Sequence, residues 1–129
     1  MSEPYRRFRS FYQDISNNRH VASSDTGLIT LVTVKNANYT LFIQKIHIEI
    51  TTGAAQTWTF QDSAGTPVPI VPSVSVAAVA HFDFDFGPNG VPCTVGTNFV
   101  LNISGAGAVG WATWEGYQQL TVVTDAKST

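Results

Sequence analysis

The sequence predicts an all-β protein, a two-sheet, jelly-roll-like β-sandwich of about eight strands with an N-terminal arm. Three observations point to this fold class. Ile, Val and Thr, whose side chains suit a pleated sheet, number 37 of the 129 residues, whereas Leu, Glu, Lys, Arg, Gln and Met together number 22. Short alternations of apolar and polar residues recur at regular spacing, with clusters of Gly, Pro and Asn between them. Hydrophobic residues make up 43% of the chain, which is enough for one core.

The predicted strands follow one another from residue 28 onward, and a generic sandwich is the second choice of fold. In the long second strand, the apolar positions change parity between Ile43 and Ile46, which predicts a β-bulge or a passage from one sheet to the other. The fourth segment contains Pro67 and Pro69, which cannot donate ladder hydrogen bonds, so it is expected at a sheet edge or in a loop. In chain order, the predicted strands cover residues 28–34, 39–52, 56–61, 66–71, 79–86, 91–95, 98–104, 109–117 and 120–123.

One face of each strand is apolar and predicts the core between the two sheets. Trp111 and Trp114 fall on opposite faces of their strand, so one is expected inside and the other outside. Burying a large side chain stabilises a fold by roughly 1.5–3 kcal/mol, so a cluster of them opposes the ordering entropy without disulfides. The expected core residues are Trp58, Phe60, Phe82, Phe84, Phe86, Phe99 and Leu101.

The chain is expected to divide into an N-terminal arm with a linker, residues 1–27, and a β-sandwich domain, residues 28–129. Four of its seven Lys and Arg residues lie in residues 2–20, interleaved with aromatic residues, and Ser23–Gly27 has the composition of a turn or linker. We therefore expect residues 2–20 to be dispensable for folding of the sandwich.

The arm is a candidate protein interface. Tyr5, Phe8, Tyr12 and Ile15 have the spacing of one stripe of a short helix, and Pro4 leaves an extended arm equally open. Arg and aromatic residues are enriched at protein interfaces, whereas the small net charge of the segment argues against nucleic acid as its partner. The candidate interface residues are Tyr5, Arg6, Arg7, Phe8, Arg9, Phe11 and Tyr12.

Two strands carry polar residues that alternate with apolar ones. His81, Asp83 and Asp85 share one face of their strand, and His47 and Glu49 share a face of another. If the strands were neighbours, these side chains could bind a divalent metal or exchange protons. The solvent faces of amphipathic strands explain them more simply, so we expect no metal site and no catalytic residues here.

Other chemistry is poorly supported. Cys93 is the one cysteine, so no intrachain disulfide is expected, and a buried structural thiol is the commoner case. Neither a Gly-x-Ser-x-Gly motif nor a phosphate-binding loop occurs, so we expect no enzyme and no cofactor. The net charge of −2 argues against a generally basic nucleic-acid binder, and no apolar run approaches the roughly 20 residues of a membrane span.

Several segments of strand and turn follow one another between Ile46 and Gln118. They are Ile46–Thr52, Ala54–Thr57, Thr59–Pro67, Phe82–Gly90 and Leu101–Ser104, ahead of a Gly-rich loop. In this order they resemble small virion proteins of tailed bacteriophages that are carried next to the major capsid gene. Some of those proteins are jelly-roll capsid decoration or cement proteins, and the resemblance carries over no catalytic residues.

The resemblance implies a structural protein that is assembled in the host cytoplasm and binds the capsid surface of a phage head. It implies the major capsid protein as partner and a homo-oligomer, commonly a trimer. A different class stays open, because Trp111 and Trp114 lie near the Gly-rich loop and exposed tryptophans stack on sugars. That alternative is a carbohydrate-binding β-sandwich, a host-adhesion module of a phage particle.

Overall fold

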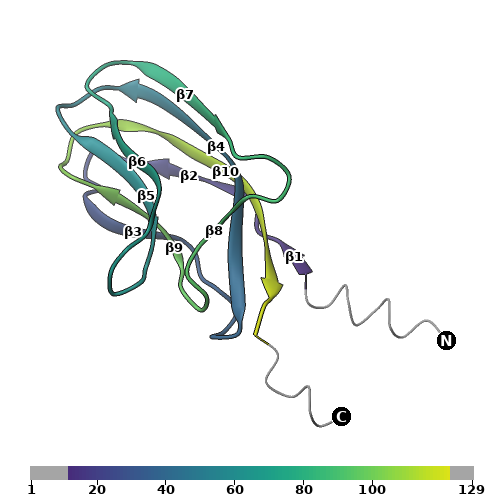
Figure 1. The fold of residues 1–129 in the computed structure, drawn as a ribbon. Coiled ribbons are helices and arrows are strands. Elements are labelled where there is room, and N and C mark those ends of the chain that lie inside the picture. Colours follow the sequence, from purple (N-terminus) through teal and green to yellow (C-terminus); the bar gives the residue numbers. More distant parts are fainter. Residues whose placement is uncertain (1–11, 123–129) are drawn as a thin grey trace, which may run out of the picture.

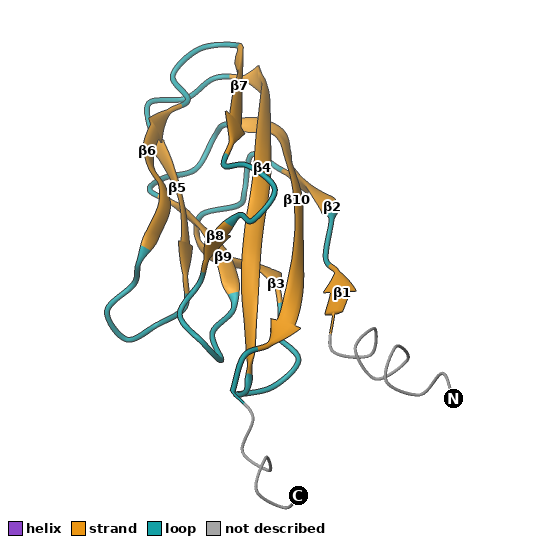
Figure 2. Ribbon diagram, turned by 45° about the vertical axis from the view of Figure 1, so that its right-hand side comes forward, coloured by secondary structure: helices purple, strands orange, loops and turns teal. Residues whose placement is uncertain are grey.

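The computed structural model describes residues 12–122, and these residues form two antiparallel sheets that lie face to face (Figure 1). Figure 2 shows that strands and loops make up both layers. No helix that could cross a membrane occurs among residues 12–122. The strands are β1 (Tyr12–Asp14), β2 (Asn17–Val21), β3 (Gly27–Val32), β4 (Tyr39–Thr52), β5 (Thr57–Asp62), β6 (Pro69–Ser75), β7 (Ala80–Asp85), β8 (Val91–Pro92), β9 (Phe99–Ile103) and β10 (Val109–Leu120).

The strand order is that of a jelly roll. In the six-stranded sheet, β1 and β2 both pair with β10, β10 pairs with β4, and β4 pairs with β7 and β8. The four-stranded sheet has the order β3-β9-β5-β6. When the short strands β1 and β8 are set aside, the first sheet contains the first, eighth, third and sixth strands along the chain. The second sheet contains the second, seventh, fourth and fifth, so the chain winds as a double Greek key and the predicted fold class is confirmed.

The parity change in β4 is a β-bulge at Gln44. Across the ladder to β10, Lys45 lies opposite Glu115 and Ile43 lies opposite Gly116, which leaves Gln44 without an opposite residue. The bulge lies where β4 changes its other neighbour from β7 to β8. The prediction of a bulge is therefore confirmed, and β4 stays in one sheet throughout.

The core lies between the two sheets and contains most of the expected residues. Trp58, Phe60, Phe99 and Leu101 are fully buried. The three phenylalanines of the segment 82–86 are only partly buried, because β7 lies at the border of its sheet. The central strand β10 packs so closely against β4 that a Cβ atom at Gly110 or Gly116 would collide with the β4 backbone.

Part of the predicted arm belongs to the β-domain itself. β1 and β2, which lie almost entirely within residues 2–20, pair with β10 at the border of the six-stranded sheet. Val21 is fully buried, and the Trp114 indole N–H donates a hydrogen bond of 2.8 Å to the Ile15 carbonyl. The expected division at residue 27 is therefore wrong for residues 12–27, because β10 takes its strand partners from a segment whose polar sequence does not reveal them. Residues 1–11 lie outside the described part of the chain.

The other differences are small. The predicted edge segment with two prolines is the edge strand β6, shifted toward the C-terminus. The separate strand expected over residues 120–123 does not form in the described part of the chain, since β10 continues to Leu120 and residues 121 and 122 are not in a strand.

Candidate functional site

The outer face of the six-stranded sheet gathers the polar residues that the sequence singles out. Strand pairing sets them in rows, because residues directly opposite each other in an antiparallel ladder point to the same face. The three rows are His20–Trp111–Glu49–His81, Asn18–Thr113–His47–Asp83 and Glu115–Lys45–Asp85. The two polar strands of the sequence analysis are therefore neighbours, as the metal or proton-exchange interpretation requires.

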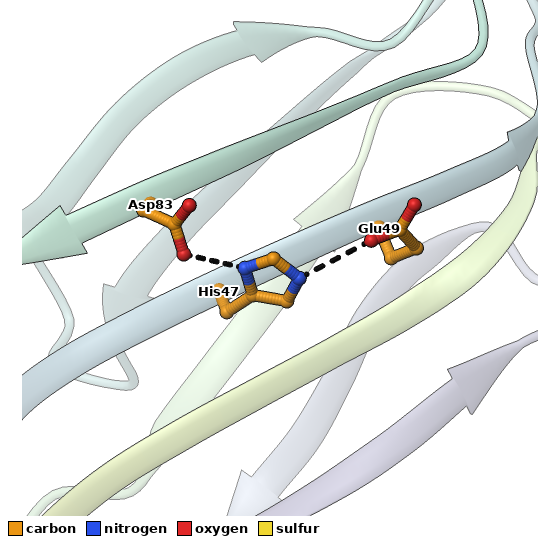
Figure 3. Close-up of polar contacts among 3 residues, drawn as sticks. All are labelled: His47, Glu49 and Asp83. Carbon is orange, nitrogen blue, oxygen red and sulfur yellow. Dashed lines mark hydrogen bonds and ion pairs between the residues drawn. The ribbon is translucent and has the colours of Figure 1, made fainter.

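His47 lies between two carboxylates at the centre of these rows (Figure 3). Its Nδ1 atom is 2.5 Å from Asp83 Oδ1, and its Nε2 atom is 3.3 Å from Glu49 Oε1. The hydrogen bond to Asp83 raises the pKa of His47, partial burial opposes that effect, and Glu49 adds to it. The protonated ring can donate through both nitrogens at once, so the charged form is favoured.

This cluster is an open surface feature. The His47 side chain is 39% exposed, and Asp83 and Glu49 are exposed further. A shallow hollow of about 280 Å³ lies beside it, lined in part by Lys45, Asp85 and Glu115. Within residues 12–122, no three His, Cys, Asp or Glu side chains are arranged to hold a metal ion. Chemically, the arrangement presents a hydrated surface of mixed charge.

A row of three stacked aromatic rings lies on the same face, beyond the bulge. The rings of Tyr12 and Phe42 each stack on Tyr117, with centroids 4.8 Å apart in both pairs. The Tyr117 hydroxyl donates a hydrogen bond of 2.9 Å to the Asn89 carbonyl, and burial raises the pKa of Tyr117. Tyr12 remains 52% exposed, so the row, here named the aromatic row, ends at the surface.

The aromatic row includes one of the predicted interface residues, Tyr12, which belongs to β1. No local pattern in the sequence identifies its partners in the row, Tyr117 and Phe42. The parity change in β4 indicates only that Phe42 points outward, and it does not indicate which ring Phe42 contacts. The other six predicted interface residues lie outside the described part of the chain: Tyr5, Arg6, Arg7, Phe8, Arg9 and Phe11.

The two tryptophans of β10 lie on opposite faces, as predicted. Trp114 is buried and packs edge-on against Phe99, with ring centroids 5.9 Å apart. Trp111 is 43% exposed on the outer face, and the His20 ring meets it edge-on at 4.8 Å. Trp111 is therefore the tryptophan that a ligand can reach.

Two buried ionisable residues elsewhere, Cys93 and Asp62, have surroundings that indicate a structural role. Burial, aided by the nearby charge of Asp62, raises the pKa of the Cys93 thiol to about 12, so this thiol is protonated at neutral pH. The Asp62 carboxylate accepts hydrogen bonds from the backbone N–H groups of Ala64, Val68 and Thr94 and from the Thr94 hydroxyl. Burial by itself raises the pKa of Asp62, but these hydrogen bonds outweigh that effect and hold it below its usual value.

No family model matches the chain, and no curated protein matches it. Among solved structures, the cryo-EM structure of the extra small virus (XSV) VLP of the giant freshwater prawn Macrobrachium rosenbergii is similar, with a TM-score of 0.40 and 13% sequence identity. The match covers 83% of this chain and 79% of that chain. A likeness of this size carries no functional conclusion, so function is inferred below from the surface of the chain itself.

Proposed function

We propose that this protein is a non-enzymatic structural protein of a virus particle, a decoration or cement protein that binds the capsid surface of a tailed phage. Its partner is the major capsid protein, and it joins the particle in the host cytoplasm. The jelly-roll strand order supports the proposal by analogy of fold, since viral capsid domains use it. The resemblance of residues 46–118 to small phage virion proteins supports the decoration role.

The observation that carries the proposal is the aromatic row. Tyr12 presents an exposed ring that is already held in place by stacking on Tyr117, so little rotamer freedom remains to be lost on binding. Such rigid aromatic anchors supply much of the binding energy at protein interfaces. In the sequence, Tyr12 directly follows residues 5–11, which are rich in the Arg and aromatic residues typical of interfaces.

Binding to capsids that lack this protein tests the proposal. The full chain should sediment with such capsids, and Tyr12→Ser should weaken binding about tenfold or more, because burying the ring is worth roughly 1.5–3 kcal/mol. Val79→Ser is the matched control, since Val79 is exposed in the loop before β7 and lies outside the aromatic row. Equal capsid binding by Tyr12→Ser and the wild type would show that the aromatic row is not part of the interface.

The proposed oligomer is a trimer, as the resemblance implies. Low charge supports self-association, because charged residues are only 12% of the chain and are depleted at interface centres. Light scattering should give three chain masses, or six if two trimers associate. A clean monomer in solution, with separated copies on the capsid, would contradict the trimer.

Exposed Trp111 favours a second candidate, carbohydrate binding. Glu49 lies opposite it in the ladder and can accept hydrogen bonds from sugar hydroxyls, and lectin domains share the jelly-roll architecture. A glycan array with the wild type and Trp111→Ala separates the candidates. Glycan binding that Trp111→Ala abolishes, without any capsid binding, would favour the host-adhesion function.

A further inference from the structure

The borders of the two sheets differ in how they are protected against pairing with another chain. An open border presents unpaired backbone N–H and C=O groups, and proteins blunt such borders with charges, prolines or very short strands. β7 carries the exposed residues His81, Asp83 and Asp85. β6 contains Pro69 and Pro72.

The remaining borders of the six-stranded sheet are interrupted or short. β8 has two residues, one of them Pro92. β1 has three residues and includes Asp14, and β2 includes Arg19. Each of these borders therefore has at least one device that discourages a further strand.

β3 is protected by neither charge nor proline, and the irregularity at Leu31 is its one device. Its sequence, Gly27–Val32, contains no charged residue and no proline, and within residues 12–122 it pairs with β9 alone (Figure 1). Leu28 on its outer face is 67% exposed. A register shift at Leu31 limits the regular part of this border to Gly27–Thr30.

The outer face next to this border is also uncharged. The strands of the four-stranded sheet contain a single charged residue, Asp62, and its side chain is fully buried. Outward positions beyond β3 include Asn102, Thr59 and Ser73. A partner strand laid along β3 therefore meets no charge within the strands of this sheet, and the nearest charged residues in sequence, Asp25 and Lys35, flank the two ends of β3.

We propose that β3 pairs antiparallel with β3 of a second copy of this chain, around a two-fold axis, and joins two four-stranded sheets into one. A two-fold axis places the residues closest to it near their own copies, so a charge at that position would repel itself. β3 meets that requirement, whereas the charged and proline-containing borders do not. The contact goes beyond the proposed capsid attachment and does not depend on it.

Charge on β3 tests the pairing in the full chain. Leu28→Lys/Thr30→Lys should halve the mass measured by light scattering, from a pair to a single chain or from paired trimers to one trimer. Ser73→Lys/Ser75→Lys is the matched control, because it places two lysines on the outer face of the opposite border, β6, and should leave the mass unchanged. Circular dichroism checks that both variants remain folded.

Cross-linking provides a second measurement that does not depend on disrupting the contact. Leu28→Cys/Thr30→Cys should form a covalent dimer under mild oxidation, whereas Ser73→Cys/Ser75→Cys should not, because β6 lies outside the proposed interface. Cys93 is buried and should not form cross-links in either variant. A mass that the β3 lysines leave unchanged, together with no β3 cross-link, would overturn the proposal. A free monomer whose capsid binding is lost in Leu28→Lys/Thr30→Lys would also overturn it, because β3 would then pair with the capsid protein.

Discussion

The two sheets share one core but present opposite kinds of outer surface. The six-stranded sheet exposes three polar rows, with His47 held between carboxylates, and the aromatic row. The four-stranded sheet exposes hydroxyl, amide and aliphatic groups, and its one charge, Asp62, is buried. One shared core thus supports two different exteriors, with charged groups and aromatic rings on one side and uncharged groups on the other.

The largest loss of stability is expected when the N-terminal strands of the six-stranded sheet are removed. Deleting residues 2–20 removes β1 and most of β2, uncovers the border of β10 and removes the acceptor for the Trp114 indole. We expect this deletion to destabilise the fold more than any single substitution below. Deleting residues 2–11 should leave the urea midpoint near that of the wild type, and equal midpoints for the two deletions would contradict the role of β1 and β2.

The shared core gives the next largest effect. Phe60→Ala should lower the free energy of unfolding by about 3–5 kcal/mol, because it opens a cavity between the sheets. Tryptophan fluorescence and circular dichroism should report a single coincident transition, since both sheets depend on this core. Separate transitions would show that the two sheets unfold independently, and Thr59→Ala on the outer face is the control.

Asp62 gives a smaller, pH-dependent effect. Asp62→Ala leaves the N–H groups of Ala64, Val68 and Thr94 without their acceptor, which should cost about 1–3 kcal/mol. Because its pKa is lowered in the folded state, Asp62 contributes stability above the ordinary value of 3.8, and that contribution is lost as the pH falls through the folded pKa. Urea midpoints from pH 7 to pH 2 should therefore converge for the wild type and the variant, and a constant difference would argue against this linkage.

The exposed cluster gives the smallest effect. The raised pKa of His47 means that its contribution to stability is full below the ordinary value of 6.5 and is lost as the pH rises through the folded pKa. Solvent screening keeps that contribution below about 1 kcal/mol. In an NMR titration, Asp83→Asn should lower the pKa of His47, whereas Asp85→Asn, the matched control, should change it less. The same pKa in both variants would show that Asp83 is not the main cause.

Local patterns predict much of the fold. The bounds of β4, 39–52, follow from its alternation, and the bulge follows from the parity change. The prolines place β6 at a border because their effect on a ladder is local. Trp58 and Phe60 are recognisable as core residues because the alternation along a single strand is enough to assign their face.

The candidate site is harder to predict because it depends on pairing between distant segments. β2 has the sequence Asn-Asn-Arg-His-Val, which is similar to that of a loop. The strand is polar because most of its residues are exposed to solvent at the border of the sheet. The stacking of Tyr12 on Tyr117 depends on the register of β1 against β10, and no local pattern contains that register. The contact between His47 and Asp83 is only one of the pairings that the sequence allows.

The bulge at Gln44 has a consequence for how the length of this chain can vary. Loss of Gln44 would join Ile43 to Lys45 in regular alternation, so every side chain of β4 would keep its face. Loss of Lys45 would have the same effect with Gln44 in its place, whereas loss of one residue from Ile46 to Ile50 would turn side chains next to the gap to the wrong face. The bulge is thus the place in β4 where natural variants can differ by one residue while both faces keep their apolar and polar residues.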